Sequence, residues 1–75
     1  MNVQITDTFG GEANFSWVNK ESFKINDANL TNRKMLKIIR EHFGITNKLR
    51  LSYDLSDELR YDFDGACICM FINFD

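Results

Sequence analysis

The sequence has 75 residues, of which 44% are apolar and 27% are charged, and its formal net charge is −2 at pH 7. A chain of this length forms one domain, residues 1–75, and buries only about 60% of the surface that the unfolded chain exposes. The composition excludes a disordered tail and a collagen-like or coiled-coil rod, and no apolar run reaches the roughly 20 residues of a membrane span. The first residues also lack the basic and apolar segments of a signal peptide, so we expect a cytoplasmic protein.

The amino-terminal segment has the pattern of a β-hairpin. Apolar and polar side chains alternate over residues 3–17, and residues 10–12 interrupt the alternation. A three-residue loop at 10–12 places Ile5 opposite Trp17, whereas a two-residue glycine loop would place apolar side chains opposite polar ones. We therefore predict the three-residue loop. Residues 23–25 indicate a short extended segment before the next element.

The next segment has the spacing of an amphipathic helix that ends at Gly44. Its apolar side chains share one helical face: Met35, Leu36, Ile38, Ile39 and Phe43. A glycine directly after the last of them is typical of a helix end. Two starts are open, because Thr31 can cap a helix that begins at the next residue and Asp27 can cap a longer one.

Three strand-like runs follow the helix. The two-residue turn at 64–65 places Tyr61 opposite Ile68, and a loop at 56–58 places Tyr53 opposite Tyr61. Both registers put the same side chains on one face: Leu49, Leu51, Tyr53, Leu55, Leu59, Tyr61, Phe63, Ile68, Met70, Ile72 and Phe74. One helix would cover that face. We therefore predict an α+β fold with an antiparallel sheet of four or five strands packed against one helix, in the order ββ(β)αβββ.

The last strand is apolar on both faces, because Cys67, Cys69 and Phe71 lie opposite the face just described. Either the amino-terminal hairpin or a second molecule must cover these side chains. Two cysteines and His42 are too few ligands for structural zinc, and a disulfide between such close neighbours would constrain the unfolded chain very little. We expect free thiols, no metal and no cofactor.

The charges are distributed unevenly. Residues 1–50 carry eight basic and five acidic side chains, whereas residues 51–75 carry one basic and six acidic ones. The predicted register places Asp54 opposite Arg60 and leaves other carboxylates uncompensated. Carboxylates along a rigid hairpin can occupy a protein groove that is built for nucleic-acid phosphates. The predicted partner-binding residues are Asp54, Asp57, Glu58, Asp62, Asp64 and Phe71.

The sequence offers no constellation for catalysis. General acid–base or nucleophilic chemistry needs convergent groups, and the one histidine, His42, lies in the last turn of the predicted helix. The glycines at 10–11 lack the lysine and the spacing of a phosphate-binding loop. We therefore predict a non-enzymatic binding protein with no catalytic residues.

A basic helix face provides an alternative binding surface. Arg33, Lys37 and Arg40 share one side of the predicted helix and could contact nucleic acid. A solvated helix face explains the same residues, the pI is about 5.2, and no recognised nucleic-acid-binding motif surrounds them.

Residues 6–18, TDTFGGEANFSWV, together with Gly65-Ala66-Cys67 and Phe71, resemble a group of small proteins carried by phages, prophages and other mobile elements. The resemblance covers the two ends of the chain, and it assigns no site residue. Small acidic accessory proteins of mobile elements include inhibitors of host defence, anti-CRISPR proteins among them.

The resemblance and the acidic hairpin together predict an anti-CRISPR-like phage protein. We expect it to act in the cytoplasm of a host bacterium by binding a host defence complex, such as a CRISPR effector, through the acidic hairpin. Neither a membrane nor direct contact with nucleic acid is part of this hypothesis. The alternatives are a nucleic-acid-associated accessory protein that uses the basic helix face, and a homodimer that closes around Phe71.

Overall fold

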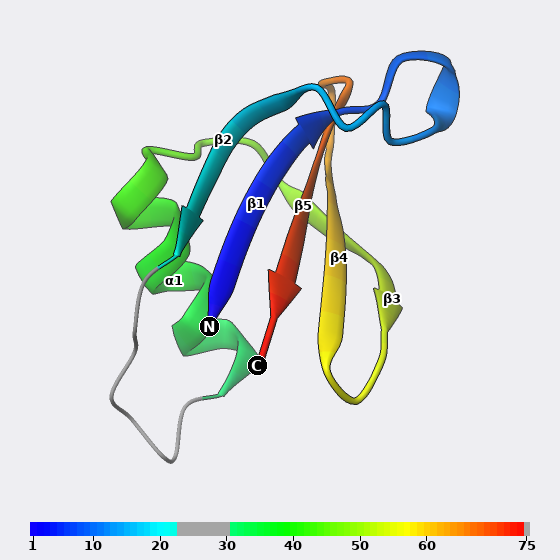
Figure 1. The fold of residues 1–75 in the computed structure, drawn as a ribbon. Helices are drawn as coiled ribbons and strands as arrows, with labels where there is room; N and C mark the ends of the chain where they lie inside the picture. Colours follow the sequence, from blue (N-terminus) through cyan, green and yellow to red (C-terminus); the bar gives the residue numbers. More distant parts are fainter. Residues whose placement is uncertain (23–30, 75) are drawn as a thin grey trace.

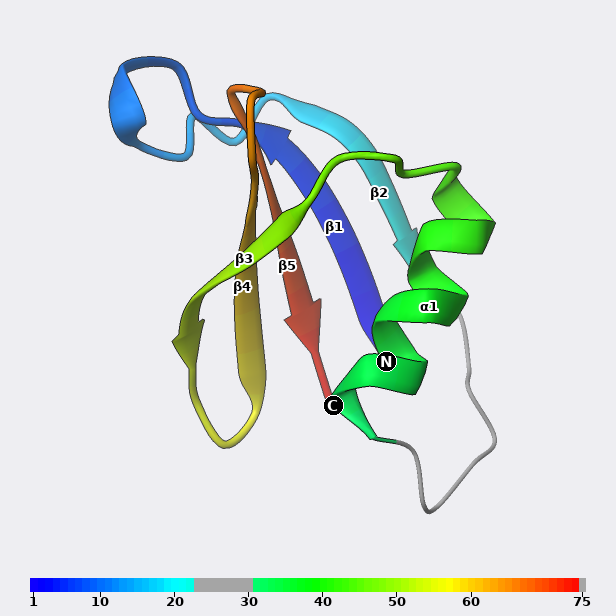
Figure 2. The ribbon, with the colours of Figure 1, turned by 180° about the vertical axis from the view of Figure 1, so that it is seen from behind.

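The computed structural model describes residues 1–22 and 31–74. The described elements are β1 (Asn2–Asp7), a 3₁₀ turn (Phe9–Gly11), β2 (Trp17–Ser22), α1 (Asn32–Phe43), β3 (Leu49–Asp54), β4 (Glu58–Phe63) and β5 (Ile68–Asn73). The strands form an antiparallel sheet in the order β2-β1-β5-β4-β3, and α1 packs on one face, here called the inner face (Figure 1 and Figure 2). The predicted α+β fold is confirmed. The extended segment predicted at 23–25 and the alternative helix cap at Asp27 lie outside the described residues.

The hydrophobic core lies between α1 and the inner face of the sheet. Its buried side chains are Val3, Ile5, Met35, Ile39, Leu59, Tyr61, Phe63, Met70 and Ile72. Figure 2 shows α1 over the β1 and β2 side of the sheet, with β3 at the other side. Leu51 on β3 consequently stays 46% exposed, although the sequence pattern assigned it to the covered face.

The boundaries of α1 follow from its two caps. The side-chain oxygen of Thr31 accepts a hydrogen bond from the backbone N–H of Lys34 at 3.2 Å, which satisfies one of the free donors of the first turn. Gly44 follows the last turn with a φ of 66°, a left-handed conformation that glycine adopts without steric cost. Of the two predicted starts, the one capped by Thr31 is confirmed.

The central position of β5 explains why its sequence is apolar on both faces. β5 pairs with β4 on one side and with β1 on the other, so the amino-terminal hairpin is part of the same sheet. On the outer face, the ring of Phe15 from the β1–β2 connection stacks on Phe71, 6.4 Å between centroids. The cover that the last strand requires therefore comes from the same chain.

The register predicted for the amino-terminal hairpin is wrong. Ile5 pairs with Asn19 rather than with Trp17, and a β-bulge then pairs Thr6 with Trp17. The connecting segment is residues 8–16 rather than residues 10–12, because the glycines form a 3₁₀ turn instead of a tight hairpin loop. Trp17 consequently lies on the outer face of the sheet, beside Phe15.

The predicted register of β4 and β5 is also wrong, although their faces are right. Tyr61 pairs with Met70 rather than with Ile68, a shift of two residues that leaves every side chain on its predicted face. The backbone N–H of Ala66 donates to the carbonyl of Phe63 at 3.3 Å, and this hydrogen bond closes the turn. Gly65 is the one residue of the turn with a positive φ, 77°. A turn whose left-handed residue is the second of the two central ones, as Gly65 is, does not match the twist of the strands, so pairing resumes farther from the turn.

A β-bulge separates β3 from its predicted register. Leu51 pairs with Tyr61, but after the bulge Tyr53 pairs with Arg60, so the prediction that Tyr53 faces Tyr61 is wrong. The extra residue transfers Tyr53 to the outer face. Asp54 pairs with Leu59 and not with Arg60, so the predicted cross-strand ion pair is not formed.

Candidate functional site

The predicted acidic surface is divided between the two ends of β4. Asp54 and Asp57 are exposed at the β3–β4 connection, beside the half-buried Glu58. Asp64 is exposed in the turn at the other end of β4, about 17 Å away for a strand of this length. We call Asp54, Asp57 and Glu58 the acidic end. These three predicted residues share one end of the β3–β4 hairpin, and Asp64 is apart from them. The bulge places Asp54 opposite Leu59, on the inner side of the sheet, whereas Glu58 lies on the outer side.

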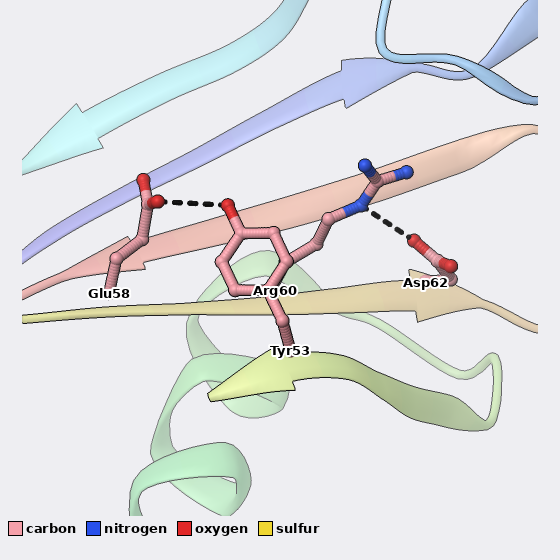
Figure 3. Close-up of polar contacts among 4 residues, drawn as sticks. All are labelled: Tyr53, Glu58, Arg60 and Asp62. Atoms are coloured by element: carbon pink, nitrogen blue, oxygen red, sulfur yellow. Dashed lines mark hydrogen bonds and ion pairs between the residues drawn. The ribbon is translucent and has the colours of Figure 1, made fainter. Parts of the chain in front are cut away.

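Asp62, between the two ends, is paired within the fold. Its Oδ1 accepts a hydrogen bond from Nε of Arg60 at 3.1 Å, and both side chains are partly buried (Figure 3). The guanidinium carbon of Arg60 also lies 5.7 Å from the ring centroid of Phe71. Asp62 therefore presents a compensated charge to any partner.

Glu58 is held by a tyrosine that the bulge brings to the outer face. The hydroxyl of Tyr53 donates to Oε2 of Glu58 at 2.8 Å, and Figure 3 shows the ring reaching across β4 to make this contact. Burial, and then the hydrogen bond to Glu58, raise the pKa of Tyr53 to about 12. Tyr53 is consequently a neutral donor at physiological pH.

Aromatic side chains form a cleft on the outer face next to the acidic end. Phe15 stacks on Phe71 with 7° between the ring planes, and it meets Trp17 edge-on at 5.7 Å. Phe15 is 62% exposed, whereas Phe71 is only 8% exposed beneath it. The cleft has a volume of about 300 Å³. We call it the outer cleft, and its lining residues are Gln4, Phe15, Trp17, Tyr53, Glu58 and Phe71.

The partner-binding prediction included only two residues of the outer cleft, Glu58 and Phe71. The sequence leaves two positions open for Phe15 and Trp17, the core or, if exposed, the anchors of a binding surface. Tyr53 was assigned to the inner face. An alternating pattern reports which residues share a face, but it contains no signal for a bulge that exchanges the faces.

The basic residues predicted on the helix also line a groove. Arg33 and Lys37 are exposed on the same side of α1, and the groove there has a volume of about 520 Å³. Arg40 lies in it as well, but its guanidinium donates to the backbone carbonyl of Asn47 at 2.7 Å. We call this the helix groove, and its lining residues are Thr31, Arg33, Lys34, Leu36, Lys37 and Arg40. Arg40 thus has a structural role, which leaves three cations for a ligand.

The cysteines and the histidine are dispersed. Cys67 is exposed and Cys69 is buried, and burial raises the pKa of the Cys69 thiol. Nε2 of His42 lies 2.8 Å from Oε1 of Glu21, a polar contact that links α1 to β2. Within residues 1–22 and 31–74, His, Cys, Asp and Glu side chains form no group of three that could hold a metal ion.

No helix in this part of the chain is long and apolar enough to cross a membrane.

Comparisons with known proteins identify no family for this chain. No family model matches it, and neither a curated protein nor a solved structure matches it. The function is therefore argued from the acidic end, the outer cleft and the helix groove.

Proposed function

We propose that the protein is an inhibitor carried by a mobile genetic element and that it binds a host defence complex in the bacterial cytoplasm. The contact surface comprises the acidic end and the adjoining outer cleft. The observation that carries this proposal is the position of Asp54 and Asp57, which are exposed and form no ion pair among the described residues. The partner surface is a basic one that otherwise receives nucleic-acid phosphates.

The two parts of the surface have different physical roles. Exposed carboxylates attract a basic partner over a distance of about 8 Å at physiological salt, which accelerates the encounter. Aromatic side chains that lose their solvent contact on binding supply most of the affinity at protein interfaces. Phe15 and Trp17 are exposed enough to do so, at 62% and 37%.

The biological context of the proposal comes from the sequence. Residues 6–18 resemble small proteins of phages and prophages, and such accessory proteins include anti-CRISPR inhibitors.

The test is the restoration of phage growth. The protein is expressed in bacterial strains that each carry one defence system, and each strain is challenged with a phage that the system restricts. We expect plaquing to recover in one strain, and immobilised protein to retain that defence complex from nuclease-treated lysate.

The double variant Asp54→Lys with Asp57→Lys should abolish the recovery of plaquing, because it reverses the charge of the acidic end. Asp64→Lys is the matched control, since it makes the same change at the opposite end of β4, and it should leave plaquing unchanged. Full inhibition of the defence system by the double variant would refute the assignment of the contact surface. If plaquing recovers in none of the strains, the proposed function is refuted.

The helix groove supports a second candidate function, the binding of nucleic acid. Arg33, Lys34 and Lys37 line a groove and are exposed, which is the arrangement that contacts phosphates. This function predicts binding to DNA or RNA that weakens steeply with salt and is lost in Arg33→Ala with Lys37→Ala. Lys48→Ala, which removes an exposed cation after the helix, is the control. Arg40→Ala is a poor test, because it removes the contact with Asn47.

A further inference from the structure

We propose that the outer cleft binds the guanidinium group of an arginine side chain presented by the partner protein. This inference rests on the proposed function and names the chemistry that its contact surface recognises. It goes beyond charge attraction at the acidic end, because it assigns one cleft and one kind of side chain.

The composition of the outer cleft fits a planar cation. Four of its six lining side chains are aromatic, and the faces of aromatic rings attract cations through the ring quadrupole. Arginine stacks on such faces better than lysine does, because its guanidinium is planar and weakly hydrated. The chain already uses this contact nearby, since Nζ of Lys20 lies 5.3 Å from the ring centroid of Trp17.

Glu58 supplies the charge that the cation requires. It is the one carboxylate in the lining of the outer cleft, and Tyr53 fixes its orientation through Oε2. No donor from the described residues binds the second oxygen, Oε1. An arginine that stacks on the rings can therefore donate an N–H to Oε1, and hydrogen bonds between charged groups are the strong ones.

The same features argue against a nucleobase in the outer cleft. Sites that stack bases place their aromatic rings in a positively charged groove, because the phosphates must be neutralised. Here the lining contains a carboxylate and no cation. Arg60 lies at the margin, but Asp62 pairs with it at 3.1 Å.

The probe for this site is N-acetyl-arginine methylamide, with the uncharged citrulline analogue as its matched control. Trp17 is the single tryptophan of the chain, so its fluorescence and its indole N–H resonance report on the outer cleft. We expect the arginine compound to change both signals saturably and the citrulline compound to change neither. Equal responses to the two compounds would overturn the proposal, and so would a response to a thymidine oligonucleotide alone.

Two test variants and one control separate a built site from nonspecific stacking. Glu58→Gln keeps an acceptor for Tyr53 but removes the charge, and it should weaken arginine binding about tenfold. Glu41→Gln makes the same change at an exposed position on α1 and should have no effect. Lys20→Gln removes a competing cation and should strengthen arginine binding by about twofold. Unchanged affinity in Glu58→Gln would overturn the assignment, and so would weaker binding in Lys20→Gln.

The cleft assignment and the proposed function can fail separately. Arginine binding without any effect on plaquing would refute the proposed function and leave the cleft assignment standing. Two results would refute the cleft assignment alone. One is recovery of plaquing by a protein that binds neither the arginine nor the citrulline compound, and the other is full recovery of plaquing by the Glu58→Gln variant.

Discussion

At the scale of single residues, the contact between Tyr53 and Glu58 gives the outer cleft its pH dependence. The pKa of Tyr53 is raised to about 12 in the folded protein, against 10.0 for an ordinary tyrosine. A group whose pKa is raised on folding stabilises the fold fully below its unfolded pKa and loses that contribution as the pH rises through the folded value. We therefore expect the stability provided by this contact to be present below about pH 10 and to disappear by about pH 12.

The measurement is a spectrophotometric titration of phenolate. Burial also raises the pKa of Tyr61, so the background Tyr61→Phe isolates the signal of Tyr53. In that background, Glu58→Gln should lower the midpoint toward 10, because the hydrogen bond to a carboxylate and its charge both favour the protonated phenol. An unchanged midpoint would mean that the two side chains do not interact.

A buried hydroxyl at Thr6 supplies a prediction about stability. Thr6 is fully buried, and its Oγ1 has no hydrogen-bond partner among the described residues. Thr6→Val keeps the shape and removes the polar atom, so it should raise the free energy of unfolding by about 1 kcal/mol. Chemical denaturation measures the change, and Thr8→Val at a half-buried position is the control. Destabilisation would show that the hydroxyl is hydrogen-bonded in solution.

At the scale of elements, α1 depends on its two caps. Thr31→Ala removes the acceptor for the N–H of Lys34 and should cost about 1 kcal/mol of stability. Gly44→Ala should cost a similar amount, about 1 kcal/mol, because its φ of 66° strains any residue with a Cβ. No atom lies within 4 Å of a Cβ built at Gly44, so backbone strain alone sets that cost. Thr46→Ala at an exposed position is the control in denaturation experiments, and equal stability in all three variants would contradict the cap assignment.

The strands show what a sequence pattern can and cannot predict. The faces of β4 and β5 were predictable, since an error of two residues in register leaves Tyr61 and Met70 on the same side. The carboxyl end of the helix was predictable because Gly44 is a local signal, whereas Thr31 and Asp27 were both possible caps for its start. The bulge before Tyr53 depends on packing and twist across the sheet, and no local signal marks it. For that reason the faces of Tyr53 and Asp54, and with them the outer cleft, could not be predicted.

At the scale of the whole molecule, charge and aromatic surface should control different rate constants. In the proposed complex, long-range attraction by Asp54 and Asp57 acts before contact, whereas Phe15 and Trp17 act after it. Once the target is isolated, Asp54→Lys with Asp57→Lys should mainly lower the association rate, and should also reduce its salt dependence. Trp17→Ala should mainly raise the dissociation rate. Binding kinetics at two salt concentrations measure both, and the reverse assignment of the rates would contradict this division of roles.

The bulges also bear on whether the sheet can grow by adding strands from other molecules. β2 and β3 are its edges, and each is paired through a bulge to the strand beside it. Both also contain charged side chains, among them Lys20 and Arg50. Bulges and charges on an edge strand oppose the docking of a further strand, which is the first step toward fibrils. The irregularities that shape the outer cleft therefore also disfavour growth of the sheet by strands from other molecules.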